Sequence, residues 1–409
     1  MRAKFVILLL FIAFGCQKEI ENPDQDSGVL YQLLTKKKKF VAGDSIVLSF
    51  RQKGTPTAAP VLVINNKVGL TVLEPQVDDT ILNFQLPEAF STKSGGITWK
   101  LMAEKITKNE GDIRIIPDTT TNLKMYSYLG PNSLVVGTDD FAYFVSAPVD
   151  QYDNPLPEGT AIEQFFQYKN DLSSETLRIE DLIVWKRFDA GQEVGQRLMT
   201  TKVNAAVSKE RPLYYRSGRA APFQIQAEQK HNFADGNQQL MITTGIIKDI
   251  FGNVVNDGTL VSFNAYDQHG HLTQMQATTI NGRATGQWVH PYRELVWDVQ
   301  AAIAREAKSN TIALSFLKAV DDFLVYFDVE ARQITVGPVM GFMEQTVPEG
   351  LPVLLTISQD NTNFSEKMMK TTKDGLAIFP LSADGFKSGA YEATIEAAGL
   401  KKTIKIQLP

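Results

Sequence analysis

Cysteine is almost absent from this sequence, because Cys16 is the only one among 409 residues. A single cysteine cannot form a disulfide within the chain, so the folded parts must be stabilised by burial of apolar side chains alone. Apolar residues make up 43% of the chain, which is enough to fill several cores. After residue 14, no apolar run approaches the roughly eighteen residues that a membrane-spanning helix needs.

Histidine is also scarce, and the four histidines are His231, His269, His271 and His290. The sequence contains no metalloprotease helix motif, phosphate-binding loop, dinucleotide fingerprint or serine nucleophile elbow. Asp267, His269 and His271 are spaced two residues apart, so in an extended strand they would lie on one face and could bind a metal. Gly270 favours a solvated hairpin turn instead. We therefore expect no metal site, no cofactor and no enzymatic activity.

The first fifteen residues have the features of a secretion signal. Arg2 and Lys4 precede ten consecutive apolar residues, 5–14, and the small residue Gly15 follows. Ten helical residues would rise only ~15 Å, half of a hydrocarbon core of ~30 Å, so this run does not predict a permanent span. Removing residues 1–15 takes away two basic residues and changes the formal charge from -5 to -7, and nothing in this balance favours nucleic acid.

The residues around Cys16 resemble the lipobox of bacterial lipoproteins, although Phe14 is bulkier than that motif usually carries. The resemblance implies a signal peptide at 1–15, lipid on Cys16 and an outer-membrane location, and an ordinary signal with an incidental cysteine is the alternative. Residues 16–29 then form a lipidated flexible tether. Its start, 17–19, resembles the charged export signal of surface lipoproteins in Bacteroidota, which implies the cell surface rather than the periplasmic face. A generic acidic tether explains the same residues.

From residue 40 onward the sequence is typical of short β-strands. Residues 45–50, 61–64 and 97–102 are rich in apolar and β-branched residues and are bounded by turn signals. Helical periodicity is scarce, and segments 172–186 and 317–325 are short and ambiguous. The pattern predicts an all-β chain, and its length predicts several domains of ~100 to 150 residues.

An internal repeat is the strongest signal in the chain. Five positions recur 99 residues later: Gly137, Asp150, Asn154, Gly159 and Thr160 recur as Gly236, Asp249, Asn253, Gly258 and Thr259. Asp and Asn bend a chain through hydrogen bonds from side chain to backbone, and Gly supplies positive φ. Calcium held by acidic residues of these turns, such as Asp153, Glu158 and Asp257, is an alternative, but no Asp-x-Asp-x-Asp array is present.

Weaker copies extend the repeat to four predicted β-sandwich domains, at 30–117, 118–229, 230–316 and 317–409. Residues 278–284 and 371–377 belong to two of these copies. We take 200–205 as the equivalent in the second domain, which predicts an insertion near 171–192. The segment 223–227 is predicted to be the closing strand of that domain.

The block 236–301, and less closely 132–227, resembles the bacterial immunoglobulin-like domains of invasin and intimin. The residues that carry the resemblance are 248–253, Asp257, Gly258, Thr259, 261–263 and 278–284. The resemblance implies a tandem array of immunoglobulin-like β-sandwich domains, which in that family serve as spacers and adhesive arms.

Aromatic residues are the candidates for recognition, because exposed rings can stack on sugars. Trp185 and Trp288 could serve in this way, whereas Trp297 alternates with apolar residues and should face inward. Two loop-like clusters are predicted recognition patches, with ordinary packing as the alternative. They comprise Trp288, His290, Tyr292 and Arg293 in one cluster, and Tyr214, Tyr215 and Arg216 in the other.

The sequence therefore predicts a non-catalytic outer-membrane lipoprotein that acts as an adhesive or scaffolding arm. Its expected partners are the membrane, through lipid on Cys16, and a surface protein or glycan. The alternative is an accessory subunit of an outer-membrane β-barrel complex for nutrient uptake, secretion or outer-membrane protein assembly. A subunit should expose a large apolar patch, whereas an arm should have a polar shaft and sites at 317–409.

Overall fold

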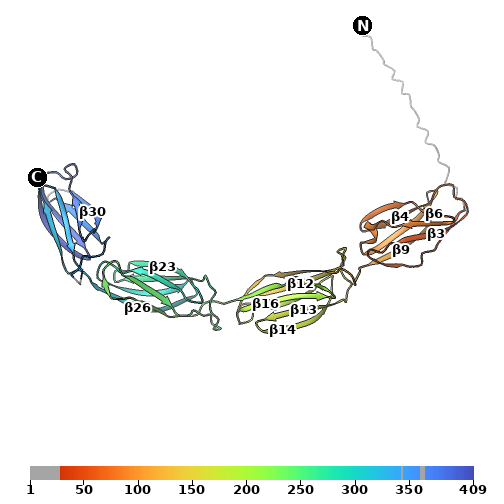
Figure 1. Ribbon diagram of the computed structural model, residues 1–409, viewed down its shortest axis with the longest axis horizontal. Helices are drawn as coiled ribbons and strands as arrows, with labels where there is room; N and C mark the ends of the chain where they lie inside the picture. The colour runs from red at the N-terminus through yellow and green to blue at the C-terminus, as the bar shows by residue number, and fades with distance from the viewer. Residues whose placement is uncertain (1–27, 342–343, 360–363) are drawn as a thin grey trace, which may run out of the picture. The chain divides into compact units, whose positions relative to one another are not determined.

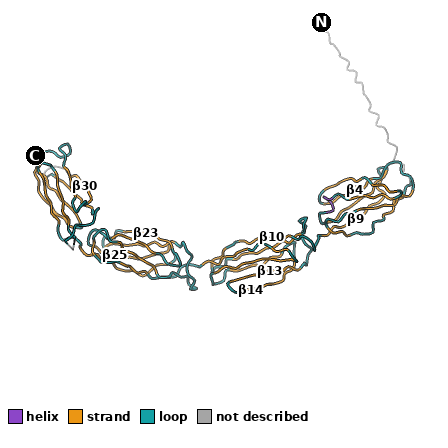
Figure 2. Tube along the Cα trace, viewed as in Figure 1, coloured by secondary structure: helices purple, strands orange, loops and turns teal. Residues whose placement is uncertain are grey.

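The computed structural model describes residues 28–341, 344–359 and 364–409. The predicted signal peptide, Cys16 and nearly all of the tether lie outside these residues. The described chain is all-β, with 33 strands and one short helix, α1 (Glu88–Ser91) (Figures 1 and 2). None of its helices is long and apolar enough to cross a membrane.

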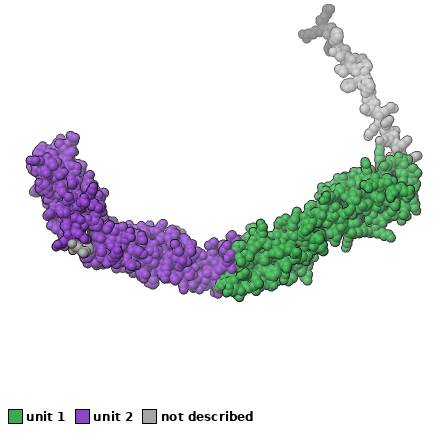
Figure 3. Space-filling view, in the orientation of Figure 1, with its two compact units in different colours: residues 1–130, 143–188, 197–212 green, residues 131–142, 189–196, 213–409 purple. Residues whose placement is uncertain are grey.

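The chain divides into two compact units (Figure 3). Unit 1 contains residues 28–130, 143–188 and 197–212, and unit 2 contains residues 131–142, 189–196 and 213–409. Each unit holds its own hydrophobic cores, so each is described by itself.

The first sandwich of unit 1 is built from two sheets. One has the strand order β1-β3-β7-β6 and the other β2-β9-β8-β4-β5. The strands are β1 (Leu30–Leu33), β2 (Lys39–Val41), β3 (Val47–Lys53), β4 (Val61–Asn66), β5 (Gly69–Leu73), β6 (Gln76–Asp78), β7 (Ile81–Gln85), β8 (Gly95–Ala103) and β9 (Ile106–Ile116). Alternate side chains of the central strands β3, β4 and β8 face the core, where Phe50 packs edge-on against Phe84 and Trp99 at centroid distances of 5.9 and 5.4 Å.

Two further sheets of unit 1 enclose a second core, which contains Ile162, Val184 and Val203. One sheet has the order β10-β12-β15, and the other contains β14, β13 and β16, with β17 paired to β16. The strands are β10 (Lys124–Gly130), β12 (Phe141–Val149), β13 (Ala161–Tyr168), β14 (Asp171–Arg178), β15 (Val184–Asp189), β16 (Gly195–Val203) and β17 (Ala206–Val207).

The predicted insertion near 171–192 is wrong. β14 pairs with β13 along its whole length, from Ala161↔Arg178 to Tyr168↔Asp171, and β15 belongs to the other sheet, so both are regular strands of the sandwich. The prediction failed because it matched residues 200–205, which lie mainly in β16, to 278–284. The isolated bridge Glu180↔Ile183 is the true counterpart of Ile280↔Arg283.

β11 (Ser133–Val135) lies in unit 2 and runs parallel to residues 214–216 of β18 (Arg211–Arg216), which lie in the same unit. The next sandwich has sheets of order β19-β21-β24 and β20-β26-β25-β22-β23. Its strands are β19 (Ile225–Glu228), β20 (Phe233–Ala234), β21 (Gln239–Thr244), β22 (Leu260–Asp267), β23 (Leu272–Thr278), β24 (Thr285–Val289), β25 (Leu295–Ile303) and β26 (Ala307–Lys318).

The structure also corrects the predicted boundary between residues 229 and 230. β19 pairs with β21, and Phe223 and Ile225 lie in the same core as Val261 and Trp297. The segment predicted to close the second domain therefore belongs to the following sandwich. Alternation alone could not decide this, because a first strand and a last strand have the same pattern.

The last sandwich of unit 2 has sheets of order β27-β28-β31 and β30-β29-β32-β33. Its strands are β27 (Phe323–Asp328), β28 (Gln333–Val339), β29 (Pro352–Ser358), β30 (Ser365–Thr371), β31 (Ala377–Pro380), β32 (Gly389–Ala397) and β33 (Leu400–Leu408). Fully buried side chains such as Phe323 and Phe379 fill its core.

These strand orders are those of immunoglobulin-like sandwiches. In each, the first, second and fifth main strands share one sheet, and the third, fourth, sixth and seventh share the other. A short parallel pair marks one edge in β2·β9, β11·β18 and β20·β26. The predicted fold class, a tandem array of immunoglobulin-like β-sandwiches, is confirmed. The division into four domains at the predicted limits stays a prediction, apart from the boundary corrected above.

Candidate functional site

The turn between β12 and β13 is organised by a buried carboxylate, Asp150. Its Oδ1 accepts hydrogen bonds from the backbone N–H groups of Tyr152 and Asn154, both at 2.9 Å. Its Oδ2 accepts from the side-chain amide of Asn154 at 2.8 Å and from the N–H of Asp118, just after β9, at 3.2 Å. The side chain is fully buried, and these four hydrogen bonds compensate for the loss of water around its charge.

Asn154 connects this turn to the loop that precedes β8. Its Nδ2 donates to the carbonyl oxygen of Thr92, and its Oδ1 accepts from the N–H of Ser94, both at 2.8 Å. Lys93, between these two residues, donates through Nζ to the carbonyl oxygen of Tyr152. One carboxamide therefore joins a loop of the first sandwich to the turn that follows β12.

The same arrangement recurs in unit 2. Asp249 accepts from the N–H groups of Phe251, Asn253 and Gly218, each at 2.9 Å, and from the Asn253 amide. The Asn253 amide donates to the carbonyl oxygen of Gln192 at 2.8 Å and accepts from the N–H of Val194 at 3.2 Å. We call each set, formed by Asp, Asn and the loop they contact, a junction clamp.

A glycine and an aromatic ring complete each junction clamp. A Cβ at Gly43 would overlap the ring of Tyr152, and a Cβ at Gly137 would overlap the ring of Phe251. Both glycines have positive φ, at 91° and 74°, which disfavours any other residue. The repeat therefore encodes close contact between a loop and the next turn, as well as the turn itself.

The prediction that Asp and Asn shape these turns is confirmed by the hydrogen bonds above. Burial alone would raise the pKa of Asp249, but hydrogen bonds from Asn253, Gly218 and Phe251 lower it below its ordinary value. The carboxylate thus stays charged at neutral pH. No group of three or more histidine, cysteine, aspartate or glutamate side chains suited to a metal ion occurs in the described part of the chain.

The loop between β24 and β25 lies at the third equivalent position. Its register is marked by the backbone hydrogen bond from the N–H of Gly236 to the carbonyl oxygen of Pro291 at 3.0 Å. Gly43 donates to Ser91 at 3.0 Å and Gly137 donates to Gly191 at 2.8 Å in the same way. Here the Cβ of Tyr292, from the loop itself, lies 3.2 Å from where a Cβ of Gly236 would be.

No junction clamp forms at this third loop among the described residues. Gly341 and Gln345 occupy the places of Asp249 and Asn253, because the N–H of Gly341 donates to the carbonyl oxygen of Gln345 at 2.7 Å. Instead, the turn before β33 contacts the loop. A Cβ at Gly399 would come within 2.8 Å of the Cβ of Arg293.

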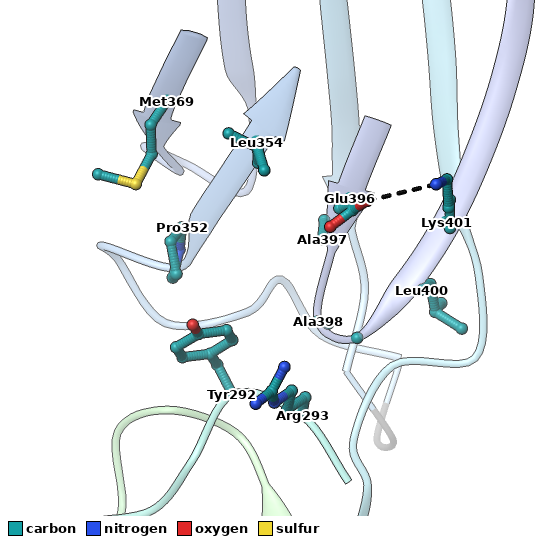
Figure 4. Close-up of a pocket in the computed structure, with 11 residues that line it drawn as sticks. Tyr292, Arg293, Pro352, Leu354, Met369, Glu396, Ala397, Ala398, Leu400 and Lys401 are labelled. Carbon is teal, nitrogen blue, oxygen red and sulfur yellow. Dashed lines mark ion pairs between the residues drawn. The ribbon is translucent and has the colours of Figure 1, made fainter. Parts of the chain in front are cut away.

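Two hollows flank the contact between Arg293 and Gly399. The first has a volume of about 440 Å³, and Figure 4 shows Tyr292 and Arg293 on one side of it and the ion pair of Glu396 and Lys401, at 3.6 Å, on the other. Its apolar wall is formed by Pro352, Leu354, Met369 and Leu400. The second hollow shares Arg293 and Gly399 and is also lined by Glu294 and Gln268.

The structure divides each predicted recognition patch into buried and exposed residues. Trp288 and His290 are buried in the core, and the Trp288 ring lies 5.6 Å from that of the inward-facing Trp297, as predicted for the latter. Tyr292 is 46% exposed, and Arg293 is exposed beside it. The second patch is the strand β18 rather than a loop, so Tyr214 and Arg216 face solvent and Tyr215 faces inward.

His290 has an unusual environment below the exposed loop. Its Nδ1 is 2.9 Å from the carbonyl oxygen of Phe233, and its ring packs against His231 and Phe316. Its buried Nε2 has no hydrogen-bond partner among the described residues. Burial lowers the pKa of His290, so the imidazole is neutral near pH 7.

Sequence reasoning named Trp185 as a candidate for recognition but missed the three tyrosines that form an aromatic surface with it on the β10-β12-β15 sheet. Tyr126, Tyr128, Tyr143 and Trp185 are exposed there, and the rings of Tyr143 and Trp185 meet edge-to-face at 5.4 Å. Tyr128 lies over Gly130, where a Cβ would overlap its ring. The signal was the two-residue spacing of Lys124, Tyr126 and Tyr128 in β10, which places all three side chains on the outer face.

The turn of Asp267, His269 and His271 is the hairpin tip between β22 and β23, as Gly270 indicated. Asp267 accepts from the N–H groups of both histidines and lies 2.9 Å from the His271 ring. Burial raises the pKa of Asp267, whereas these hydrogen bonds, chiefly the one from the His271 side chain, lower it. The net effect is a pKa of about 2.

No protein-family model matches this chain, and no curated protein matches it. Among solved structures, the Escherichia coli adhesin FdeC is similar over 71% of this chain and 98% of its own, at 13% identity and a TM-score of 0.41. Invasin, described as a bacterial integrin-binding protein, is similar over 93% and 79%, at 11% identity and a TM-score of 0.41. The FN1–FN3 domains of chicken CNTN1 cover 71% of the chain at 10% identity and a TM-score of 0.29. Likeness at this level does not assign the chain to a family.

Proposed function

We propose that this chain is a non-catalytic, lipid-anchored outer-membrane arm that acts at the cell surface in adhesion or scaffolding. The observation that carries the proposal is the junction clamp, built twice with the same Asp, Asn, Gly and aromatic residues. A turn needs only the hydrogen bonds within it, whereas the side-chain NH₂ and oxygen of Asn154 and Asn253 both form hydrogen bonds with the preceding loop. Such residues are useful in an arm whose loops must stay bound to the turns that follow them.

The lipobox resemblance supports the base of the arm. Cys16→Ala should abolish lipidation, so the protein should leave the membrane fraction or accumulate with its signal uncleaved. Labelling with a radioactive fatty acid, followed by fractionation, measures both outcomes. Unchanged membrane attachment of the variant would remove the lipid anchor from the proposal.

Adhesion is tested on whole cells that carry the protein. Cells with wild-type protein should adhere to host-cell or matrix-coated surfaces, and cells with the double variant Asn154→Ala, Asn253→Ala should adhere less at equal surface amount. Protease shaving followed by immunoblotting measures that surface amount. If cells with the wild-type protein adhered no more than cells lacking it, this result would contradict the proposal.

The aromatic surface of Tyr126, Tyr128, Tyr143 and Trp185 favours a second candidate, an accessory subunit of an outer-membrane β-barrel complex. A patch of this kind on the side of a sandwich is what a docked subunit needs and what a bare shaft does not. Purification of the native protein in mild detergent, followed by mass spectrometry, separates the candidates. A barrel protein in equal amount supports the subunit, and its loss in a Tyr128→Ser, Trp185→Ser variant would locate the interface.

A further inference from the structure

We propose that the β24–β25 loop binds the side-chain carboxamide of an asparagine or glutamine presented by a protein partner. The inference rests on the proposed function, for which it names the partner's chemistry and the anchoring point. It comes from a comparison within the chain. Two equivalent loops each hold a carboxamide, and the third holds none in the described residues.

The first two loops show what such a site requires. Thr92 supplies a carbonyl oxygen and Ser94 supplies an N–H, and together they hold both polar atoms of Asn154 at 2.8 Å. Gln192 and Val194 hold Asn253 in the same way. Only backbone groups of the loop take part, so the pairing does not depend on which side chains the loop carries.

The third loop keeps this backbone register. The hydrogen bond from Gly236 to Pro291 matches those that precede Thr92 and Gln192 in the other loops. It places the carbonyl oxygen of Tyr292 and the N–H of Glu294 where the other two loops hold an asparagine side chain. We call these two backbone groups the receptor. Neither group has a hydrogen bond within residues 28–341, 344–359 and 364–409.

The chain itself does not fill this receptor with a described residue. Gly341 has no carboxylate to orient an amide, unlike Asp249. Gln345, in the place of Asn253, lines a separate cavity of about 50 Å³ together with Ala234 and Ala319. The receptor groups belong instead to residues that line the two hollows beside Arg293.

The geometry favours a primary carboxamide over the acetamido group of an amino sugar. In the first two loops, the donor and acceptor of the amide face the same way, as the NH₂ and oxygen of an Asn or Gln side chain do. The acetamido group of an amino sugar is a trans secondary amide, so its N–H and C=O point in opposite directions. The hollow of about 440 Å³, with the Tyr292 ring and the exposed Met369 on its walls, leaves room for neighbouring side chains of a partner.

The test uses the chain's own turn as the probe. A cyclic peptide with the sequence of residues 148–156 carries the Asp, Tyr and Asn of the first junction clamp. It is titrated into ¹⁵N-labelled protein comprising residues 17–409, and the backbone amide signal of Glu294 is followed. We expect this signal to shift, and a control peptide with Asn154→Ala to bind about tenfold more weakly, since two hydrogen bonds are lost.

A clamp-restoring variant gives a second, independent readout. Gly341→Asp with Gln345→Asn should fill the receptor internally and abolish the peptide's effect, whereas Gln345→Asn alone should keep it. Gly341 does not have positive φ, and its added Cβ would meet only ordinary contacts, 3.7 Å from Gln345 O and 3.9 Å from Ala319 O. The spectrum of the free variant reports whether the fold is retained.

Three results would overturn the inference: no shift at Glu294, equal binding of the two peptides, or an equal shift caused by a trimer of N-acetylglucosamine, which would make the ligand a glycan. Loss of peptide binding on restoring the clamp supports it. If the peptide does not bind but cells adhere normally, this site is rejected and the proposed adhesive arm stands. If cells do not adhere, the adhesive arm is rejected, whether or not the peptide binds.

Discussion

Asn253 donates a hydrogen bond from its side-chain amide to the carbonyl oxygen of Gln192, 61 positions earlier, at 2.8 Å. Asn154 makes the equivalent hydrogen bond to Thr92. In both cases a buried aspartate four residues before the asparagine orients the amide. The pairing makes a loop and the next turn into one hydrogen-bonded assembly, which is the structural basis of the proposed arm.

Two glycines with nearly the same φ allow the cost of backbone strain to be measured separately from the cost of side-chain overlap. Gly137 and Gly159 have φ of 74° and 75°, but a Cβ at Gly137 would overlap Phe251, whereas nothing lies within 4 Å at Gly159. We expect Gly159→Ala to cost about 1 kcal/mol of unfolding free energy and Gly137→Ala at least ~1 kcal/mol more. Urea denaturation measures both. In a Phe251→Ala background the excess at Gly137 should disappear, and an unchanged excess would contradict the contact.

Acid should weaken the junction clamp at Asp249. Its pKa is lower in the folded state than in the unfolded chain, where it is about 3.9. The stabilisation is therefore complete above about pH 5 and is lost as the pH falls through 4 toward the folded-state pKa. Unfolding of residues 17–409, measured between pH 6 and 2.5, should show this loss. Asp249→Asn should lower stability at pH 6 and flatten the decline, and an equally steep decline would assign the effect to other carboxylates.

His290 should make the third sandwich sensitive to mild acid. Its folded-state pKa is lowered, so the unfolded chain binds a proton that the folded chain does not. Stability then falls as the pH drops below about 6.5, by at most ~1.4 kcal/mol per pH unit for one group. The nearby titratable groups are His231 and Asp235. His290→Phe should remove this slope between pH 7 and 5, while the exposed His269→Gln should keep it. A slope shared by all three proteins would exclude His290 as its source.

Much of the fold could be predicted because its signals are local. Asp, Asn and Gly at fixed spacing determine turns, and the alternation of apolar residues along the strand determines that Trp297 faces the core. Strand order and partner depend on contacts between distant residues, so β19 was placed in the wrong sandwich and β14 was mistaken for an insertion.

The site was predictable only in part for the same reason. Asp150 and Asn154 were recognised as turn formers, but their contacts with Asp118 and Thr92 lie 32 and 62 residues away, beyond any local pattern. Trp288, His290, Tyr292 and Arg293 were predicted together as one recognition patch. Tyr292 and Arg293 are exposed, whereas Trp288 and His290 lie in the same segment and are buried. Solvent exposure within a strand end depends on what the rest of the sandwich covers.

The central claim is that each junction clamp holds a loop against the next turn through an asparagine side chain. In unit 2 the backbone N–H of Val194 reports on the clamp, because it donates to Oδ1 of Asn253 at 3.2 Å. We predict that this N–H of residues 17–409 exchanges slowly with solvent deuterium in the wild type and much faster in Asn253→Ala, with Thr243→Ala, which loses only an exposed hydroxyl contact, behaving as wild type. Exchange that is equally fast with and without the Asn253 side chain would contradict the claim.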